Sequence, residues 1–219
     1  MELSQNQDLI TKDLVGGGTG YLIAKRLLDL FAATLGVVLL SPIMLIVAIM
    51  IKLEDPRGPV IFSQLRCGES PKTFKIYKFR SMYVDAEERL SELQHLNEQT
   101  GPVFKIKDDP RITKVGKLIR KTSLDELPQL FNVIKGDMSL VGPRPALPTE
   151  TEQYTKYQMQ RLLVKPGITC IWQVSGRNKI GFDEWVELDI KYIKNRSFWL
   201  DLKLILLTIP ALLGDDNAS

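Results

Sequence analysis

The most apolar run of the chain covers Leu27–Ile51, and Asp29 is the one charged residue inside it. A helix over this run would be about 37 Å long, which exceeds the roughly 30 Å hydrocarbon core of a bilayer. A cleaved signal peptide is disfavoured, because the run starts late, is too long and lacks a small-residue cleavage pattern. The pattern therefore predicts a membrane helix.

A Ser-Pro pair, Ser41 and Pro42, interrupts the middle of this run. Pro42 has no backbone N–H, and its ring crowds the carbonyl of Val38. The Ser41 hydroxyl can donate a hydrogen bond to the carbonyl of Val37 or Val38, which supports a sharp bend. The residues alone fit both a helix that spans the bilayer and a re-entrant helix that enters and leaves through one leaflet.

Both ends of the run carry basic residues, with Lys25 and Arg26 before it and Lys52 and Arg57 after it. Charge bias therefore does not draw the two ends to opposite sides of a membrane. Spanning and re-entrant topologies stay open on this ground as well.

A β-rich pattern follows at Val60–Gln64 and Thr73–Phe79, around turn residues at Gly68–Pro71, and predicts an antiparallel hairpin. Alternation along the second segment places Lys78 and Arg80 at the end of an apolar face. The two cations either face an anionic group or reach solvent at the strand end.

Periodicity of 3.6 residues predicts four further helices, and Gly101–Arg111 is strand-like and then turns. The last predicted helix is very apolar, so it is either buried or lies in the membrane interface. These elements together indicate an α+β fold that is mostly α. The predicted helices cover Asp85–Asn97, Thr151–Val164, Phe182–Asn195 and Phe198–Leu213.

Composition narrows the chemistry. The chain has 219 residues with 29 basic and 26 acidic side chains, a balance that disfavours nucleic-acid binding. His95 is the one histidine, which nearly excludes a Ser-His-Asp hydrolase or a His-rich metal site. Cys67 and Cys170 lie far apart and are most simply free thiols in a reducing compartment. Any catalysis must therefore use carboxylates, Lys, Arg and backbone groups.

Two adjacent acids stand out within Ile119–Gly136, where apolar residues have helical spacing. Ser123 as N-cap with Glu126 at the third helical position matches a capping box. Asp125 as N-cap would instead place Pro128 at the third helical position, where no helical N–H is lost. Both interpretations put Asp125 and Glu126 at a helix N-terminus.

Such a position can be catalytic or merely structural. Helix N-termini favour phosphate, and Arg120 can reach the same helix end. There an aspartate would be kept ionised and free to attack phosphorus, and a neighbouring glutamate could hold Mg²⁺. However, acids in the first turn are common in ordinary helices, and a capping box alone explains Ser123 and Glu126.

A second candidate is the segment Gly142-Pro143-Arg144-Pro145. An arginine between two prolines sits on a stiff backbone, and a fixed guanidinium suits phosphate or nucleobase contacts. The alternative is a solvated arginine in a surface loop. The chain lacks a DxD motif, which argues against the common metal-dependent glycosyltransferases.

Several motifs in order carry a family resemblance. KFRSM (Lys78–Met82), Arg120–Pro145 and KPGITCIWQVSGRN (Lys165–Asn178) resemble the monotopic phosphoglycosyl transferases, which start bacterial exopolysaccharide, O-antigen and glycoprotein-glycan synthesis. The resemblance runs from about Lys25 to Leu213. The segment Gly101–Thr113 is similar to larger undecaprenyl-phosphate hexose-phosphate transferases, which usually carry an extra N-terminal membrane region.

The resemblance implies a catalytic module attached to the cytoplasmic face of a bacterial inner membrane. It favours the re-entrant topology and a small cytoplasmic domain with amphipathic helices and a short antiparallel sheet. The expected organisation is a flexible leader at 1–20, a re-entrant membrane helix at 21–53 broken at Ser41-Pro42, and a catalytic domain at 54–219 with an interfacial helix at 198–213.

The resemblance also implies a mechanism. Asp125 would be the nucleophile that attacks the sugar-side phosphorus of a UDP-sugar and releases UMP. Polyprenyl phosphate, here undecaprenyl phosphate, would then take the phosphosugar. Glu126, with Asp125, would bind Mg²⁺, and Arg120 would contact phosphate.

The same family pattern extends the substrate site. Arg144, held between Pro143 and Pro145, would contact the nucleotide, and Lys78 and Arg80 match a substrate-binding motif. The resemblance favours glucose or galactose as the sugar. Membrane lipid is an expected partner and nucleic acid is not an expected partner. A homo-oligomer is compatible with the resemblance.

Two rival functions remain at this stage. A non-catalytic scaffold of polysaccharide assembly would form no UMP, and a glycosyltransferase that breaks the sugar–phosphate bond would release UDP instead of UMP.

Overall fold

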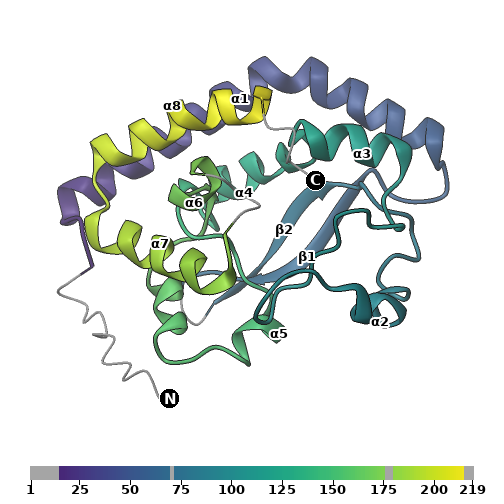
Figure 1. Cartoon of the computed structure of the whole chain (residues 1–219). Coiled ribbons are helices and arrows are strands. Elements are labelled where there is room, and N and C mark those ends of the chain that lie inside the picture. The colour runs from purple at the N-terminus through teal and green to yellow at the C-terminus, as the bar shows by residue number, and fades with distance from the viewer. Residues whose placement is uncertain (1–14, 70–71, 176–179, 215–219) are drawn as a thin grey trace, which may run out of the picture.

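The computed structural model describes residues 15–69, 72–175 and 180–214. A long N-terminal helix, α1 (Thr19–Glu54), lies along one side of a small domain of short helices and two-stranded sheets (Figure 1). This arrangement confirms the predicted α+β class with mostly helical content. Residues 1–14 of the expected leader lie outside the described residues.

Helix α1 continues through Pro42 as one helix, although Pro42 has no N–H to donate to Val38, so the expected break is a bend inside a continuous helix. The Ser41 hydroxyl donates to the carbonyl of Val38 at 2.8 Å, one of the two carbonyls expected from the sequence. Figure 1 shows that the helix changes direction near its middle. By length and composition, α1 is the one helix of the described chain that could cross a membrane.

Helix α1 packs on the domain on both sides of the Ser41-Pro42 bend. Ala33 packs with buried residues of the helix at Gln129–Lys135, while Val47 and Ile51 pack with Phe79 and the helix at Lys114–Lys121. Between positions 34 and 46 no residue is buried. The apolar residues around the bend are therefore largely exposed and belong to neither buried cluster.

The predicted hairpin is confirmed. Strands β1 (Ile61–Cys67) and β2 (Thr73–Phe79) pair antiparallel with Gln64 opposite Ile76. The fully buried side chain of Asn132 satisfies backbone hydrogen-bonding groups on the free edge of β2. It accepts from the Tyr77 N–H and donates to the Lys75 carbonyl. This side chain replaces a third strand and fixes the position of α4 against β2.

A second, parallel pair joins β3 (Ser139–Val141) to β4 (Gly167–Thr169) and was not predicted from the sequence. Two glycines allow the backbones to cross closely here. A Cβ on Gly167 would lie 2.0 Å from the Gly142 nitrogen, and one on Gly142 would lie 2.4 Å from the Lys165 carbonyl oxygen. Larger residues at either position would push the two segments apart.

Of the remaining helices in the described chain, only the last two, at Phe182–Asn195 and Phe198–Gly214, are longer than eight residues. The remaining helices are α2 (Leu90–Leu93), η2 (Gln94–Leu96), α3 (Lys114–Lys121), η3 (Leu124–Glu126), α4 (Gln129–Lys135), α5 (Pro148–Thr151), η4 (Gln158–Leu163), α6 (Ile171–Val174), α7 (Phe182–Asn195) and α8 (Phe198–Gly214). The helices predicted at Phe182–Asn195 and Phe198–Leu213 are confirmed.

Three local predictions are wrong. Thr151–Val164 is helical only at its first residue, where α5 ends, and over η4. Asp85–Asn97 is helical only over its second half, and Gly101–Arg111 contains no strand. In the last case the Asn97 side chain accepts from the Lys105 N–H and donates to the Val103 carbonyl. Side-chain hydrogen bonds thus replace the strand ladder that the pattern indicated.

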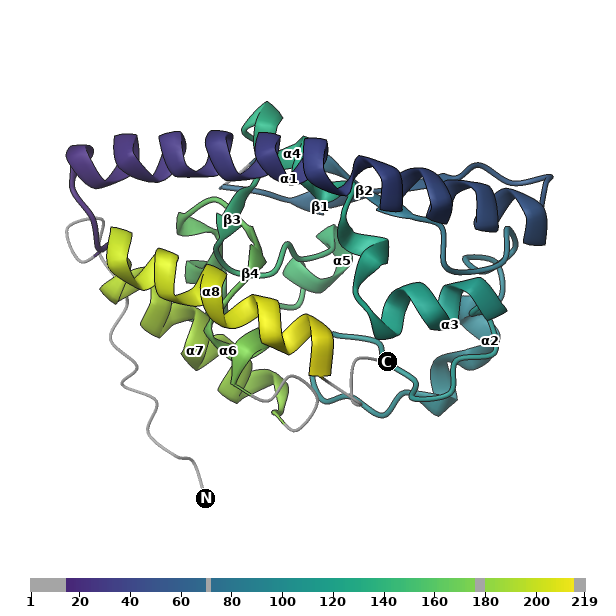
Figure 2. The same ribbon diagram turned by 90° about the horizontal axis from the view of Figure 1, so that it is seen from above.

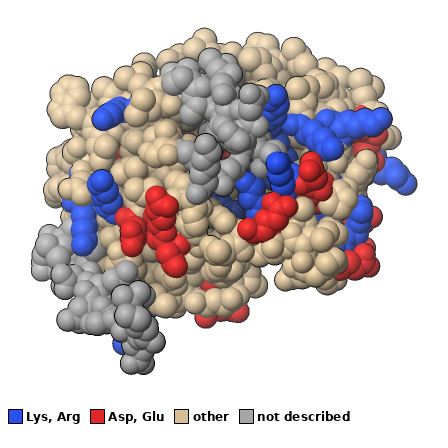
Figure 3. Space-filling model, in the orientation of Figure 1, with Lys and Arg blue, Asp and Glu red and all other residues tan. Residues whose placement is uncertain are grey.

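Helix α8 runs beside the N-terminal part of α1, as Figure 2 shows from above. A buried ion pair of 2.8 Å between Lys25 and Asp201 joins the two helices. Trp199 at the start of α8 is 75% exposed. In Figure 3 the upper edge, formed by α1 and α8, is almost entirely free of charged side chains. Over residues 19–54 and 198–208, the exposed side chains of the two helices are therefore mainly apolar.

Candidate active site

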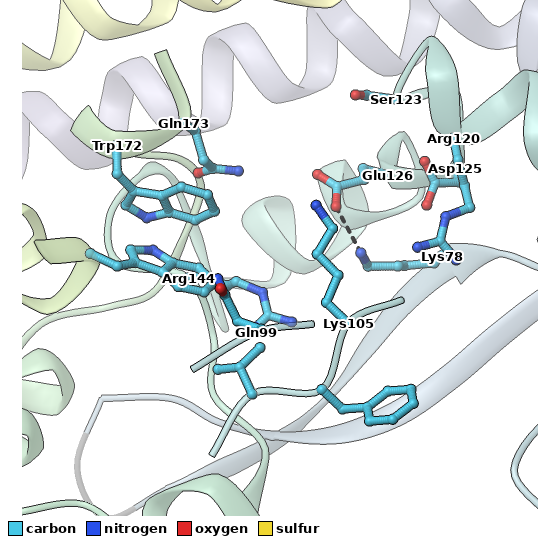
Figure 4. Close-up of a pocket in the computed structure, with 13 residues that line it drawn as sticks. Lys78, Gln99, Lys105, Arg120, Ser123, Asp125, Glu126, Arg144, Trp172 and Gln173 are labelled. Atoms are coloured by element: carbon cyan, nitrogen blue, oxygen red, sulfur yellow. Dashed lines mark hydrogen bonds and ion pairs between the residues drawn. The ribbon is translucent and has the colours of Figure 1, made fainter. Parts of the chain in front are cut away.

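A cavity of about 260 Å³ opens beside the acidic turn and contains most of the predicted site residues. It lies between the Asp125–Glu126 turn on one side and Trp172 and Arg144 on the other (Figure 4). Lys78 and Arg120 also line it. The structure thus brings together five predicted residues from four separate elements.

The acidic turn is not the helix N-terminus that the sequence indicated. Ser123 has a left-handed backbone with φ of 53° and makes no side-chain cap hydrogen bond, so the predicted capping box is wrong. Asp125 and Glu126 lie in the short η3, and α4 begins only at Gln129, with Pro128 as its N-cap. The alternative in which Asp125 caps the helix is wrong for the same reason.

Left-handed backbone is unfavourable for serine, and Ser123 is the one non-glycine residue of the described chain with positive φ. Backbone hydrogen bonds nevertheless hold Ser123 on both sides. Its N–H donates to the Arg120 carbonyl, and its carbonyl accepts from the Glu126 N–H. Such locally strained turns persist where the surrounding structure dictates them, and they cluster at functional sites.

Asp125 is only 8% exposed, and burial raises the pKa of its carboxyl from 3.8 to about 6. The neighbouring Glu126 carboxylate contributes to this rise in pKa, whereas the charges of Lys78 and Arg120 limit it. The helix N-terminus that was expected to keep Asp125 ionised is absent at this position, and the charges of Lys78 and Arg120 favour its charged form instead.

Glu126 is held by an ion pair. Its Oε1 lies 2.7 Å from the Lys78 ammonium, both side chains being about one third exposed. Lys105 points its ammonium toward the same carboxylate (Figure 4). Because Asn132 fixes α4 on β2, the preceding turn is held opposite Lys78 at the end of that strand.

The opposite wall is aromatic and cationic. The Arg144 guanidinium lies 5.3 Å from the ring centre of Trp185 and 3.6 Å from the Glu150 carboxylate. Trp172 meets Trp185 edge to face, with ring centres 4.0 Å apart. A planar guanidinium beside two indoles offers both stacking and hydrogen-bonding surface to a ligand.

Pro143 and Pro145 are buried and do not line the cavity. The Pro143 carbonyl accepts from the Gly167 N–H at 2.9 Å, and the Pro145 carbonyl accepts from Arg66 at 3.1 Å. The two prolines therefore hold the loop that presents Arg144.

Arg80 lies elsewhere. Its guanidinium is buried and binds both the Asp55 carboxylate, at 2.8 Å, and the Asp55 carbonyl, at the end of α1. A Cβ on Gly58 would overlap this guanidinium, so glycine makes room for it. The structure does not bring Arg80 to the cavity.

Sequence reasoning missed several lining residues. Trp172 and Lys105 lie inside motifs that carried the family resemblance, so those motifs could have pointed to them. Trp185 sits on the apolar face of α7, where its spacing indicates only core. The missed lining residues are Gln99, Val103, Phe104, Lys105, Trp172, Gln173 and Trp185.

The donor set fits a divalent cation that also binds a phosphate-bearing substrate. Across the described residues, no cluster of three or more Cys, His, Asp or Glu side chains could hold a metal. Mg²⁺, however, is usually held by one or two carboxylates, with substrate phosphates and water completing its shell. Asp125 and Glu126 supply such a pair at the cavity wall.

An apolar helix fastened to a small α+β domain is typical of a membrane-associated protein, and the cavity beside it carries two carboxylates and four cations. The bacterial sugar transferase family matches residues 20–215. The chain belongs to this family.

Relatives share most of this chain. It is 53% identical over 196 residues to the galactosyl transferase CpsE of Streptococcus agalactiae, covering 88% of this chain and 43% of that protein. It is 44% identical over 199 residues to the undecaprenyl-phosphate galactose phosphotransferase of Salmonella typhimurium, covering 89% and 41%. This chain thus spans about two fifths of the length of these relatives.

A shorter relative matches over nearly its full length. The exopolysaccharide production protein ExoY of Rhizobium meliloti is 40% identical over 193 residues, which cover 86% of this chain and 85% of that protein. The domain described above therefore makes up most of that relative.

Proposed function

We propose that this chain transfers a sugar 1-phosphate from a UDP-sugar to undecaprenyl phosphate and releases UMP. The observation that carries the proposal is the single cavity in which Asp125 and Glu126 face Lys78, Arg120 and Arg144. Phosphoryl transfer needs positioned cations and a positioned nucleophile more than acid–base groups, so a chain with one histidine suits it. Kinship with a named undecaprenyl-phosphate galactose phosphotransferase supports this choice.

Binding comes first. The diphosphate of the UDP-sugar lies between Arg120 and Lys78 on one wall and Arg144 on the other. Guanidinium groups bind phosphate oxygens through paired hydrogen bonds, and the Arg144 loop is stiffened by its two prolines. This arrangement places the sugar-side phosphorus next to the acidic turn.

The first chemical step uses Asp125. A carboxylate oxygen of Asp125 forms a bond to the sugar-side phosphorus, the bond from that phosphorus to the bridging oxygen breaks, and its electron pair leaves with UMP. Lys78 and Arg120 stabilise the ionised carboxylate before attack.

The second step regenerates the enzyme. An oxygen of the lipid phosphate forms a bond to the same phosphorus, and the bond to Asp125 breaks to restore the carboxylate. Glu126 and Asp125 are the residues that would hold Mg²⁺, and Mg²⁺ bound there would neutralise charge on phosphate oxygens.

The acceptor explains the membrane helix. The lipid tail of the acceptor stays in the bilayer, so a domain fastened at the membrane surface meets the phosphate group without extracting it. The apolar, largely exposed residues around Pro42 and the contacts of α1 with the domain on both sides of it favour a re-entrant helix, with both ends at the cytoplasmic face of the inner membrane. The exposed Trp199 of α8 suits the membrane interface.

The test is a panel of UDP-sugars, including glucose, galactose and N-acetylgalactosamine, offered to the detergent-solubilised chain with Mg²⁺. UMP should appear up to about one equivalent per enzyme without lipid and then stop, with a sugar phosphate gained on the peptide that contains Asp125. Added undecaprenyl phosphate should restart turnover with parallel-line kinetics.

Three other outcomes contradict parts of the proposal. UDP in place of UMP identifies a glycosyltransferase, and neither nucleotide identifies a scaffold. UMP that forms only when lipid is present, with no adduct on Asp125, indicates direct transfer between the two substrates.

A further inference from the structure

A buried ion pair lies directly behind the aromatic wall of the cavity. The Nε of Arg161, in η4, lies 2.8 Å from Oδ2 of Asp189, in α7, and their side chains are 3% and 0% exposed. Neither residue lines the cavity. A buried pair of this kind often contributes little net stability, since both charges lose their hydration.

Arg161 contacts two residues of the wall. Its Nη2 donates to the Arg144 carbonyl at 3.4 Å, and its guanidinium lies 5.7 Å from the ring centre of Trp185. Its Nη1 donates to the Tyr154 hydroxyl at 2.7 Å, and the Phe182 ring lies 5.9 Å away. The planar guanidinium thus holds a backbone and a ring of the wall at the same time.

Asp189 extends the link to the third wall residue. Its Oδ1 accepts a hydrogen bond from the Cys170 thiol at 3.1 Å. Cys170 is the N-cap of α6, the helix that carries Trp172. The pair therefore connects the Arg144 loop, the start of α6 and the α7 helix of Trp185.

The wall has few other polar restraints. Within the described part of the chain, the buried indole N–H groups of Trp172 and Trp185 have no hydrogen-bond partner. The orientation of the two rings therefore rests on packing and on the neighbouring guanidinium groups. Small rotations of Trp185 would also move its contact with Arg144.

We propose that Arg161, paired with Asp189, is a positioning residue that holds Arg144 and Trp185 in the geometry that binds the nucleotide portion of the substrate. The inference rests on the proposed function. It assigns the pair to nucleotide affinity and not to the chemical step, because the acidic turn lies across the cavity from this wall (Figure 4).

The test is Arg161→Lys, which keeps the charge opposite Asp189 but loses the planar, multiply bonded guanidinium. UMP binding, measured by equilibrium dialysis on the detergent-solubilised full chain, should weaken about tenfold, as for the loss of one charged hydrogen bond. The KM for the UDP-sugar should rise to a similar extent. The kcat and the KM for undecaprenyl phosphate should change by less than about threefold, because the acidic turn is not displaced.

Two further variants separate positioning from general stability. Ile193→Val removes one methyl group in the same core and on the same helix, so it should lower the melting temperature without changing UMP affinity. Tyr154→Phe keeps the ring and removes only the hydroxyl bonded to Arg161, so UMP binding should weaken about threefold. If Arg161→Lys does not fold, Tyr154→Phe decides the question.

The proposal is overturned if Arg161→Lys or Tyr154→Phe lowers stability while UMP affinity stays at the wild-type value. It is also overturned if kcat falls with binding unchanged, or if the wild-type chain does not bind UMP. If the wild-type chain binds UMP but releases none from any UDP-sugar, the proposed function is contradicted. The UMP affinities of the variants and the wild type would still test the positioning role.

Discussion

The ammonium of Lys78, at the end of β2, lies 2.7 Å from the carboxylate of Glu126, in the turn before α4. The same carboxylate is the one we propose for Mg²⁺, so the lysine holds Glu126 in place and competes with the cation for it. The charge of Lys78 also lowers the pKa of the adjacent Asp125. One cation on a strand thus influences both acids of the site.

Asp125→Asn should abolish both UMP release and adduct formation, because the amide keeps the shape of the side chain and loses the nucleophilic oxygen. Circular dichroism and size-exclusion profiles should match the wild type. The measurement is UMP per enzyme with Mg²⁺ and UDP-sugar. Near-normal turnover of the purified variant would rule out the covalent mechanism.

Glu126→Gln should cut turnover by about 100-fold or more and weaken its dependence on Mg²⁺, since a neutral amide binds the cation poorly. The measurement is initial rate against Mg²⁺ concentration. A matched control is Glu152→Gln, an exposed residue at the end of α5, which should leave the Mg²⁺ dependence unchanged. Equal Mg²⁺ titrations for Glu126→Gln and wild type would contradict the metal assignment.

Asp125 should also make folding stability depend on pH. Its pKa is raised from 3.8 to about 6 in the folded chain, so the folded state binds the proton more tightly than the unfolded state. In the wild type, the contribution of this carboxyl to the free energy of unfolding is therefore present below pH 4 and is lost as the pH rises toward 6. Asp125→Asn has no titrating group at this position, so its stability does not fall in this way.

The comparison should be made with EDTA present. The stability of Asp125→Asn relative to wild type should increase between pH 4 and 7, by about 1–3 kcal/mol in total. Denaturant unfolding of both chains across this range measures it. A constant difference across the range would show that the pKa of this carboxyl is not raised in the folded chain.

Pro42→Leu should straighten α1, because leucine supplies the backbone N–H that proline lacks and has no ring to clash with the Val38 carbonyl. Some molecules should then span the bilayer and place the N-terminus outside. Single cysteines at Lys12 and Arg57, in a chain without Cys67 and Cys170, can be tested with an impermeant thiol reagent on intact cells.

In the chain with Pro42 retained, neither single cysteine should react from outside until the cells are opened. With Pro42→Leu, the cysteine at position 12 should become partly reactive. Labelling of position 12 from outside in the chain that retains Pro42 would contradict the re-entrant topology.

The two native cysteines should differ sharply in reactivity. Burial, together with the charge of Asp189, raises the pKa of the Cys170 thiol well above its ordinary value, so it stays protonated at pH 8. Cys67 is only half-buried. Mass spectrometry after mild alkylation of the folded protein should therefore find the label on Cys67, and on Cys170 only after unfolding. Equal labelling of both in the folded chain would contradict the buried contact with Asp189.

Local patterns identified the elements that depend on nearby residues. Helix α7 and the β1–β2 hairpin follow their periodicity, and the Ser41 hydroxyl binds one of the two carbonyls expected. In these cases the hydrogen-bond partners lie within a few residues or on the adjoining strand, so sequence spacing describes the geometry. The acids and cations of the site were also visible in the sequence as residue types.

Tertiary contacts decided the rest. The helix expected over Asp85–Asn97 forms only over its second half. In place of the strand expected at Gly101–Arg111, backbone groups of this segment hydrogen-bond to the Asn97 side chain. Lys78 faces Glu126 while Arg80, two residues later, turns to Asp55. Both cations belong to the same sequence motif, and only the packing of α4 and of the end of α1 against β2 separates their environments.

The sequence by itself determined an apolar helix bent at Pro42, a hairpin, and the carboxylates and cations of the candidate site. Only the tertiary structure decided that Asp125 lies in a buried turn with a raised pKa, that Trp172 and Trp185 form the opposite wall, and that Arg161 and Asp189 stand behind it. The physical reason is that burial and ion pairing join residues distant along the chain, which no local periodicity encodes.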